Sequence, residues 1–383
     1  MTASAPMAPK ISLFLQDLHG GGAERVMLRL AAGIAERSHP VDLVLIRREG
    51  AFIDAIPPGV RPVVLNTKRT LNSVAALARY LRRERPAALL SALVHVNVGA
   101  LLAATLARTR TRTIVTEHSQ ITRNFSANSS TTVRLAYRMV PWLYPRATRI
   151  VAVSAGVADD LAQFSGMAVD RINVVHNGIV TPDLHAKAVE PCDHPWFRPG
   201  EPPVILAAGR MVDVKDFAAL IRAFALLRTR RDARLMILGE GELRPDLELL
   251  ARTLGVADHV AMPGFFDNPY ALMSRAAVFV QSSRWEGLPS VLVEAMACGT
   301  PVVATDCPGG TREILDDGRL GALVPLDDDQ AMADAIGHTL DNPVPANAMA
   351  SKVEQFTLER AVDTYLELAL GRPGGQGLPE RRR

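Results

Sequence analysis

Cysteine is scarce in this sequence, and the spacing of the few that occur suggests no use for them. Cys192, Cys298 and Cys307 are odd in number and form neither a CxxC pair nor a zinc-ligand pattern. This argues against a disulfide framework and favours a reducing compartment. The first ten residues also lack the apolar core of an export signal, so we expect none.

Two common nucleotide-binding signatures are missing as well. The glycines at 20–22 do not form GxGxxG, and the segment 41–50, VDLVLIRREG, places arginines before Glu49 where the dinucleotide pattern has an acid closing a second strand. No segment matches GxxxxGK[ST]. The sequence therefore argues against a nicotinamide dinucleotide and gives no support for a P-loop.

Metal-ligand clusters of His, Cys and Asp are not apparent either. The acidic run DDD at 327–329 could bind a metal, but it precedes an apparent helix, where acidic residues interact favourably with the macrodipole. We interpret this run as a helix start, and we expect neither a metal nor a cofactor.

One apolar segment is long enough to raise the question of a membrane span. Residues 87–107, AALLSALVHVNVGALLAATLA, are about as long as a bilayer requires. Arginines flank both ends, so no charge asymmetry orients the segment. A buried strand at 88–92 followed by a buried helix explains it equally well, and the strand-then-helix rhythm of the whole chain favours that second interpretation.

The small net charge of +3 hides an imbalance between the two halves. Residues 1–178 contain 22 Lys and Arg against 11 Asp and Glu, whereas residues 179–383 contain 21 against 29. This asymmetry indicates that the first half faces something anionic.

Short β-branched runs alternate with longer helical patterns along the chain. Such alternation predicts α/β architecture, with parallel sheets covered by helices on both faces. Two successive series predict two doubly wound, Rossmann-like domains facing across a cleft, with ligands beyond the carboxyl ends of the strands. The expected strands are KISLFLQ, VDLVLI, RPVVLN, ALLSA, TIVTEH and RIVAVS in the first series, and PVILAAG, RLMILG, VAMPG, AVFVQSS and PVVAT in the second.

Composition also suggests where the domains begin and end. Residues 1–180 form the expected first domain, and 203–345 the second. Between them, 181–202 is rich in proline and poor in periodicity, which is typical of a linker. We expect a C-terminal helix at 346–370 and a disordered, Gly/Pro-rich and basic tail at 371–383.

Two carboxylates interrupt an otherwise apolar stretch at 282–305, SSRWEGLPSVLVEAMACGTPVVAT. Glu286 falls in the loop after a strand, and Glu294 falls in the helix that Pro289 is suited to begin. The exposed amides of that helix start favour an anion. Ionised carboxylates only accept hydrogen bonds, so beside an anion site they match hydroxyl-rich groups such as sugars and ribose. The alternative is that both are exposed helix-surface glutamates.

A second candidate site follows the strand PVILAAG. Gly209 allows close approach of the backbone, and Arg210 and Lys215 come just after the strand end. Arginine offers a rigid fork for phosphate oxygens and lysine a flexible point charge, so a diphosphate is a natural ligand. Alternatively, the two form an ordinary surface pair.

The first domain contributes two further candidates. Gly21 and Gly22 lie between a strand and a helix N-terminus, which makes an anion cradle, although a plain tight turn remains open. His118 follows Glu117 at the end of the strand TIVTEH, at the same edge of the predicted sheet. A lone histidine there is either structural or part of a ligand pocket.

Taken in order, these motifs resemble those of retaining glycosyltransferases of family 4, which have the GT-B fold. EGLPSVLVE resembles their E-x7-E signature. The neighbouring segments GGAERV, TEH, VAVSAGVADDL, VVHNG, MILGEGELRPDLE, PGFFDNPYALMSRA and ACGTPVVATDCPGG also resemble family segments. The resemblance covers roughly residues 10–340. NGIV lacks the acid that often follows this Asn-Gly-apolar turn, which weakens only the position of the domain boundary.

The resemblance implies a role for each candidate in the second domain, which would bind a nucleotide sugar. Arg210 and Lys215 would hold the donor diphosphate. Glu294 would accept hydrogen bonds from the ribose hydroxyls. Glu286 would bind hydroxyls of the transferred sugar, and backbone amides near Gly287 and Leu288 would assist.

It also implies roles for the first domain, which would bind the acceptor. Gly21 and Gly22 would let this domain close on the phosphates, and His118 would line the sugar pocket near the anomeric centre. His118, Glu286, Arg210 and Lys215 are therefore the candidate catalytic residues. The leaving phosphate would take the acceptor proton, so no side-chain base is needed, and the protein would supply positioning and electrostatic stabilisation.

The implied reaction is transfer of a sugar, with retained configuration, from a nucleoside-diphosphate sugar, with a UDP-sugar expected. The acceptor would be a glycan or a lipid-linked molecule in cell-surface polysaccharide or glycolipid synthesis. We expect a cytoplasmic enzyme, peripheral at the inner face of the membrane, with no nucleic-acid partner. Basic and aromatic residues alternate at 131–150, TTVRLAYRMVPWLYPRATRI, which suits a lipid headgroup region. A nucleotide-sugar epimerase and a non-catalytic nucleotide-sugar-binding protein remain the alternatives.

Overall fold

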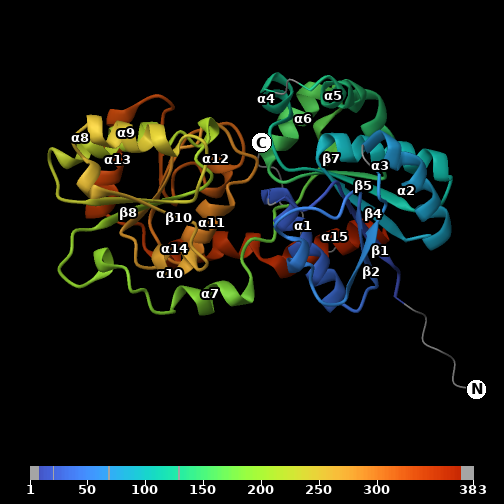
Figure 1. Cartoon of the computed structure of the whole chain (residues 1–383), viewed down its shortest axis with the longest axis horizontal. Coiled ribbons are helices and arrows are strands. Elements are labelled where there is room, and N and C mark those ends of the chain that lie inside the picture. The colour runs from blue at the N-terminus through green and yellow to red at the C-terminus, as the bar shows by residue number, and fades with distance from the viewer. Residues whose placement is uncertain (1–7, 20, 68–69, 128–129, 372–383) are drawn as a thin grey trace, which may run out of the picture. The chain divides into compact units, whose positions relative to one another are not determined.

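The computed structural model describes residues 8–19, 21–67, 70–127 and 130–371. The chain divides into two compact units (Figure 1). The first unit runs to Gly178 and takes up the chain again from Leu358, and the second unit is Ile179–Thr357. Each unit contains its own parallel sheet and its own core.

The sheet of the first unit has the strand order β3-β2-β1-β4-β5-β6-β7, and all its neighbouring pairs are parallel. The central strands are continuous apolar runs because helices cover both faces. The order reverses between β1 and β4, which creates the crevice where doubly wound proteins bind ligands. The strands are β1 Ile11–Leu15, β2 Val41–Leu45, β3 Val60–Val64, β4 Ala88–Ala92, β5 Arg112–Glu117, β6 Arg149–Ala152 and β7 Ile172–Val174.

Helices from both ends of the chain cover this sheet. The last helix, α15, packs against α1, where Val362 approaches so closely that a Cβ at Gly33 would lie 2.4 Å from its Cγ2. Figure 1 shows this red helix among the blue elements of the first unit. The helices are α1 Gly22–Glu36, α2 Thr70–Glu84, α3 Val94–Ala107, α4 Ile121–Ala127, α5 Thr131–Leu143, α6 Ala155–Ser165 and α15 Leu358–Leu370, with 3-10 turns at Ile53–Ala55, Tyr144–Arg146 and Val169–Arg171.

The second unit repeats this topology. Its strand order is β10-β9-β8-β11-β12-β13, again parallel, with the reversal between β8 and β11. The strands are β8 Val204–Ala208, β9 Arg234–Leu238, β10 Val260–Gly264, β11 Val278–Gln281, β12 Val302–Thr305 and β13 Ala322–Val324. The helices are α7 Pro182–Ala188, α8 Phe217–Arg228, α9 Arg244–Thr253, α10 Pro269–Met273, α11 Ser290–Ala297, α12 Thr311–Ile314, α13 Asp329–Asp341 and α14 Ala346–Val353.

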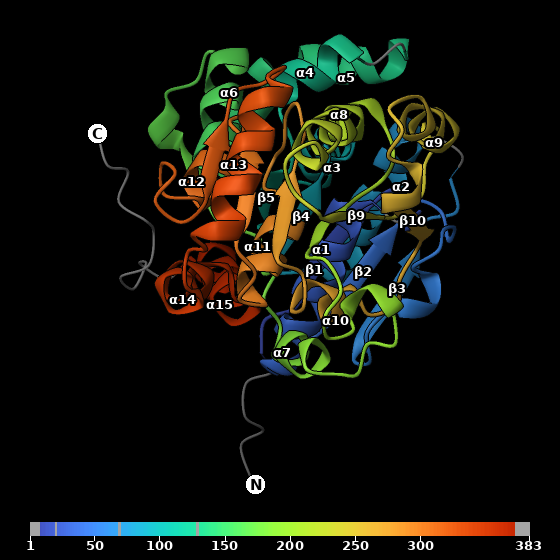
Figure 2. The ribbon, with the colours of Figure 1, turned by 90° about the vertical axis from the view of Figure 1, so that its left-hand side faces the viewer.

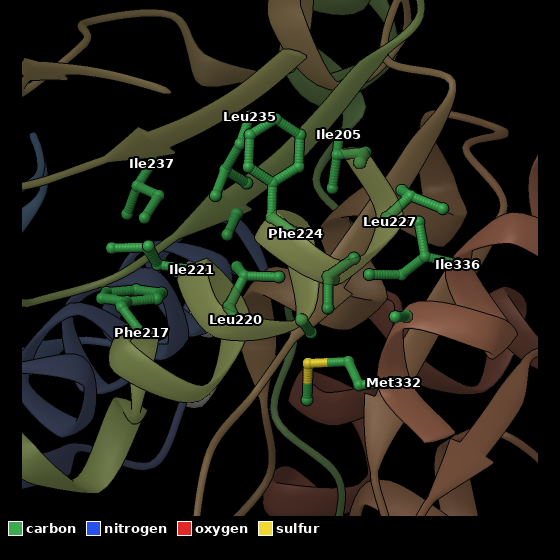
Figure 3. Close-up of a cluster of buried hydrophobic side chains, with 14 of the residues drawn as sticks. Ile205, Phe217, Leu220, Ile221, Phe224, Leu227, Leu235, Ile237, Met332 and Ile336 are labelled. Carbon is green, nitrogen blue, oxygen red and sulfur yellow. The ribbon is translucent and has the colours of Figure 1, made fainter. Parts of the chain in front are cut away.

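Helix α8 forms the centre of the core on one face of the second sheet. Figure 2 shows α13, α8 and α9 side by side, in agreement with their contacts. Phe224 of α8 is fully buried between strand residues such as Ile205 and Leu235 and the α13 residues Met332 and Ile336 (Figure 3). This packing fixes the carboxyl end of β8, from which the loop to α8 leaves.

The apolar segment 87–107 is a strand followed by a helix. It forms β4 and then α3, whose 14 residues pack against α2 and α5. In the described part of the chain, no helix combines the length and the apolar character that crossing a membrane requires.

The segments outside the two expected domains are more structured than composition suggested. The expected linker, 181–202, contains α7, which packs on α10. The segment 181–202 is held on the second unit by three side chains that donate to its backbone carbonyls, those of Asn268, Ser274 and Arg275. The expected C-terminal helix, 346–370, is divided into α14, a 3-10 turn and α15, and only α15 returns to the first unit. The expected tail, 371–383, lies outside the described residues except for Gly371.

Candidate functional site

The reversal of strand order in the second sheet brings two polar loops together. Strand β8 leads into Gly209 and Arg210, and its neighbour β11 leads into the loop 282–289. Both loops leave from the carboxyl ends of their strands, so they lie at the crevice of the doubly wound fold. The sequence placed Arg210, Lys215 and Glu286 in these two loops and Glu294 in the helix that follows the second one.

An ion pair joins the loops. The Lys215 Nζ lies 2.6 Å from the Glu286 Oε1, and the Ser283 hydroxyl donates to the same oxygen at 2.7 Å. Both charged side chains are largely buried, with 22% and 13% of the side-chain surface exposed. The Ser282 hydroxyl donates to the Lys215 carbonyl at 2.7 Å, so backbone as well as side chains tie the loops together. The two serines were not among the sequence candidates, although they begin the same loop as Glu286.

Close backbone approaches explain two of the glycines around this pair. Gly309 has a φ of +125°, and a Cβ there would lie 1.9 Å from the Glu286 carbonyl oxygen. Gly239 has a φ of +123°, and its Cβ would lie 2.1 Å from the Gly209 carbonyl oxygen. Because no side chain fits at either position, both loops are held against neighbouring backbone. The amide of Glu286 donates to the Pro308 carbonyl at 3.0 Å and completes this support.

Glu294 occupies a different environment, on the buried side of α11. Only 6% of its surface is exposed, and the Tyr270 hydroxyl lies 3.3 Å from its Oε1. Burial, together with the charge of Glu294, raises the pKa of the Cys298 thiol to about 12. The alternative that Glu286 and Glu294 are exposed surface glutamates is therefore wrong.

The remaining second-domain candidates lie in the same two loops. Gly287 and Leu288 are buried between Glu286 and the start of α11, and the Gly287 carbonyl accepts from the Gly310 amide at 2.9 Å. Arg210 is exposed at the beginning of the loop that ends in Lys215.

In the first unit, Gly21 and Gly22 begin α1. Gly21 is the N-cap in extended conformation and Gly22 is the first helical residue. A Cβ at Gly22 would meet nothing within 4 Å, whereas one at Gly21 would lie 2.2 Å from the Glu24 carboxylate. Gly20, the first glycine of the run, lies outside the described residues.

His118 follows β5 and is fixed through one ring nitrogen. Its Nε2 lies 2.9 Å from the Thr116 hydroxyl, which itself donates to the Ser91 carbonyl at 2.9 Å. Because the Thr116 hydroxyl gives its proton to the Ser91 carbonyl, it can only accept from His118. The His118 Nε2–H therefore donates, and Nδ1 carries the lone pair. That Nδ1 is buried and has no hydrogen-bond partner among the described residues. Burial lowers the pKa of His118 to about 4, so the ring is neutral near pH 7.

A buried polar cluster supports the strand beneath His118. Glu117 accepts from the Asn97 amide at 2.9 Å and from the Tyr144 hydroxyl. The Asn97 carbonyl in turn accepts from the Ser91 hydroxyl at 2.7 Å. Burial raises the pKa of Glu117 to about 7, against the hydrogen bonds from Tyr144 and Asn97, which lower it. The sequence identified Glu117 beside His118, but nothing in the pattern connected it to α3 and to the 3-10 turn Tyr144–Arg146.

The reversal in the first sheet holds a further polar group that the sequence candidates did not include. Gln16 and Asp17 follow β1, and the His95 Nε2 lies 2.8 Å from the Gln16 Oε1. Asp17 is paired with Arg47 at 2.6 Å and with His19 at 2.8 Å. The polar pair QD at the end of an apolar strand could have indicated this position, because it marks the carboxyl edge of β1.

The structure therefore brings Lys215 and Glu286 into direct contact. Arg210, Gly287, Leu288 and Glu294 belong to the same unit, whereas the remaining candidates, Gly21, Gly22 and His118, belong to the first unit.

The acidic run at 327–329 is a helix start, as predicted. Asp328 is the N-cap of α13 and accepts from the Ala331 amide, while Asp327 pairs with Arg284 and Asp329 with Arg222. Among the residues that the structure describes, no three His, Cys, Asp or Glu side chains are grouped as a metal site would require.

Two family matches cover most of the chain. Residues 20–182 match Glycosyltransferase Family 4, and residues 193–356 match Glycosyl transferases group 1. The chain belongs to glycosyltransferase family 4. The GT-B fold and the transferase activity expected from the motifs are thereby confirmed.

Curated relatives agree with this assignment. The chain is 28% identical over 363 residues to the N-acetylgalactosamine-N,N'-diacetylbacillosaminyl-diphospho-undecaprenol 4-alpha-N-acetylgalactosaminyltransferase of Campylobacter jejuni, covering 90% of this chain and 94% of that protein. It is 35% identical over 180 residues to the lipopolysaccharide core biosynthesis glycosyltransferase LpsE of Rhizobium meliloti, covering 46% and 52%.

Solved structures show the same fold. A glycosyltransferase from Rickettsia africae superposes with a TM-score of 0.79 at 18% identity, covering 96% of this chain and all of that one. Anabaena HepE in complex with UDP and glucose superposes with a TM-score of 0.76 at 21% identity, covering 94% of this chain and 98% of that one.

Proposed function

We propose that this glycosyltransferase transfers a sugar from a nucleoside-diphosphate sugar to a glycan or lipid-linked acceptor, with retention of the anomeric configuration. The observation that carries the proposal is the Lys215–Glu286 pair at the crevice of the second sheet. Lys215 is a cation that can bind phosphate, and Glu286, in contact with it, can accept hydrogen bonds from hydroxyls. A sugar diphosphate presents those two groups on neighbouring atoms.

The donor would use both partners of the pair. Lys215 and Arg210 would hold the diphosphate through charge-assisted hydrogen bonds. Glu286, kept in place by Ser283 and by the close approach of Gly309, would accept hydrogen bonds from the sugar, with amides near Gly287 and Leu288 assisting. Glu294 would accept from the ribose hydroxyls.

Uridine is the base that we propose. The Anabaena HepE structures are complexes with UDP, with UDP and glucose, and with UDP-glucose, and their fold is that of this chain. A relative from Mycolicibacterium smegmatis, 36% identical over 170 residues, is named GDP-mannose-dependent. A guanosine donor is thus the alternative to be tested.

In the proposed reaction, the bond between the anomeric carbon and the phosphate oxygen breaks while an acceptor oxygen bonds to the same face of that carbon. The acceptor proton passes to the departing phosphate oxygen, so no side-chain base takes part. Lys215 and Arg210 would stabilise the charge that develops on the diphosphate. Neutral His118 would line the sugar pocket near the anomeric centre, and Gly21 and Gly22 would allow close approach to the phosphates.

The acceptor is proposed from the relatives' names. The Campylobacter relative is named for a diphospho-undecaprenol acceptor, and the Rhizobium relative for lipopolysaccharide core synthesis. Both names favour a lipid-linked acceptor. We infer that such an enzyme works at the cytoplasmic face of a membrane.

A panel of UDP- and GDP-sugars tests the function. Each donor is incubated with and without undecaprenyl-diphosphate-linked sugars, and the anomeric proton coupling of substrate and product is followed by NMR. We expect acceptor-dependent consumption of a UDP-sugar and a product with the donor's anomeric configuration. An inverted product would overturn the mechanism, and conversion of donor to an epimer without acceptor would overturn the function. Lys215→Ala is the negative control.

A further inference from the structure

An arginine-rich hollow lies at the amino ends of strands β4 and β5. Its volume is about 540 Å³, within the range of small-molecule sites. Two turns form it, the one between α2 and β4 and the one between α3 and β5. We call it the arginine hollow, and its lining residues are Arg82, Arg85, Pro86, Ala87, Ala107, Arg108, Thr109, Arg110 and Thr111.

The arginine hollow is separate from the candidate donor and acceptor residues. Strands β4 and β5 are parallel neighbours, and His118 follows the carboxyl end of β5 whereas Arg110 precedes its amino end. The six residues of β5 span roughly 17 Å at the usual rise per residue. A ligand in the hollow would therefore lie at the opposite edge of the sheet from His118.

Positive charge in the arginine hollow is not balanced by its surroundings. Among the described residues that line it, there is no Asp or Glu. The acid nearest in sequence, Glu84, is already paired with Lys10 at 2.6 Å, Arg61 at 2.8 Å and Arg83 at 3.1 Å. Those partners lower the pKa of Glu84 to about 2, so it stays ionised for them. Like charges gathered in this way repel each other unless an anion lies among them.

The hollow also has fixed donors. Arg82 is anchored because its guanidinium donates to the carbonyls of Leu106 at 2.5 Å and Ala107 at 3.3 Å, at the end of α3. The Thr109 hydroxyl donates to the Thr111 hydroxyl at 3.0 Å, so Thr111 keeps its own proton for another acceptor. Guanidinium forks beside a hydroxyl donor match the oxygens of a phosphate.

We propose that the arginine hollow binds a phosphate or diphosphate group, as a site distinct from the donor site. The group belongs either to a soluble phosphate compound or to a phosphate-bearing lipid headgroup. Both sources present the same oxygens to the guanidiniums of Arg85, Arg108 and Arg110. The proposal does not depend on the proposed donor, because none of the donor residues lines the hollow.

Position-specific arginine labelling tests this proposal. The full chain is treated with phenylglyoxal at constant ionic strength, with and without inorganic pyrophosphate, and labelled arginines are quantified by mass spectrometry after chymotrypsin digestion. We expect pyrophosphate to lower labelling of Arg108 and Arg110 at least threefold, while the exposed Arg198 and Arg252 of the second unit change little. Equal protection at all four positions would overturn the proposal. Labelling of Arg210 reports the donor site separately in the same digest.

Paired variants then measure affinity and identify the source. In an Arg210→Ala background, Arg108→Gln/Arg110→Gln should weaken pyrophosphate binding about tenfold or more by calorimetry, because charged hydrogen bonds are lost. Arg198→Gln/Arg252→Gln removes the same charge and should leave that affinity unchanged. In a second arm of the labelling experiment, vesicles of phosphatidylcholine with and without phosphatidic acid replace pyrophosphate. Protection by either phosphate source supports the site and names the source, and protection by neither refutes it.

Discussion

Lys215 and Glu286 form an ion pair in a largely buried site, and Lys215 is the member proposed to hold the diphosphate. We predict that Lys215→Ala and Arg210→Ala each weaken UDP binding by roughly 1.5–3 kcal/mol, the range for charged hydrogen bonds. Calorimetry with UDP alone measures this, without any sugar. Lys187→Ala is the matched control, since it removes a lysine from the exposed pair with Asp183 in the same unit. Unchanged UDP affinity in both variants would remove the diphosphate site.

Substitution of the two glutamates of the E-x7-E segment should impair different properties, UDP affinity in one case and the rate of transfer in the other. Glu294→Gln should lower the affinity for bare UDP, because the proposed partner of Glu294 is the ribose. Glu286→Gln should leave UDP affinity nearly intact and slow transfer, because its proposed partner is the sugar. Calorimetry and initial rates on both variants separate the two effects. If the phenotypes are exchanged, the roles are inverted.

Glu117 gives the first unit a pH-dependent stability of predictable sign. Its folded pKa of about 7 lies above the ordinary value of 4.5. Its contribution to stability is therefore fully present below pH 4.5 and is lost as the pH rises through 7, by up to about 3 kcal/mol. His118 has the opposite pH dependence. Because its folded pKa is lowered to about 4, its contribution to stability falls as the pH drops below 6.5.

A comparison with Glu117→Gln isolates this effect. The variant keeps an oxygen that can accept from Tyr144 but no longer titrates, while His118 contributes similarly to both proteins. We predict that the urea midpoint of the variant, relative to that of the wild type, rises between pH 5 and pH 8. An equal difference between the two proteins at both pH values would contradict a buried, neutralised Glu117.

At the scale of single elements, α1 and the loop after β12 use glycine for different reasons. A Cβ at Gly22 meets no atom within 4 Å, so Gly22→Ala should not disturb packing. Alanine is preferred within a helix by roughly 0.5–1 kcal/mol, so the variant should be slightly more stable. If Gly22 allows close approach to the donor phosphates, the same variant should lose turnover. Thermal unfolding and initial rates test this pair of outcomes.

Gly309→Ala is the contrasting change. Its Cβ would lie 1.9 Å from the Glu286 carbonyl oxygen at a φ of +125°, so folding and activity should both decline. A Gly22→Ala protein with unaltered turnover would show that the start of α1 does not approach the donor.

Elements whose residues carry a local preference were largely predictable from the sequence. The predicted strand VAMPG at 260–264 is β10 with the predicted bounds, and the predicted strand at 88–92 is β4. For segment 346–370 the sequence predicted one helix and missed its division, because the break at the 3-10 turn Glu354–Phe356 follows from tertiary packing. Phe356 is buried, and its carbonyl accepts from the amides of Ile179 and Val180.

The same distinction holds for the candidate site. Glu286 and Lys215 could be placed at strand ends, since loop position follows from the strand pattern. The Ser282–Lys215 contact and the Gln16–His95 contact could not, because they depend on which strands are neighbours. Sequence periodicity contains no information about that order.

For the molecule as a whole, the basic first half of the chain suggests an anionic surface as its partner, and α5 is the part that suits one. Leu135 and Trp142 are 53% and 74% exposed, and they are seven residues apart, so they share one face of the helix. Arg138 lies between them on the same face and is also exposed. An exposed tryptophan beside arginine is typical of residues that sit at lipid headgroups.

We therefore predict that the protein co-sediments with anionic vesicles at low salt and not with neutral ones. Each basic residue near such a surface contributes roughly 1 kcal/mol, and salt screens that attraction, so about 0.5 M salt should release the protein. Trp142→Ser should weaken binding at low salt because it removes the exposed apolar anchor. Phe265→Ser is the matched control, since Phe265 is 79% exposed in the second unit. Absence of vesicle binding at any salt concentration would contradict the membrane proposal and favour a soluble acceptor. Equal loss in both variants would instead show that α5 is not the contact, because any exposed aromatic would then serve as well.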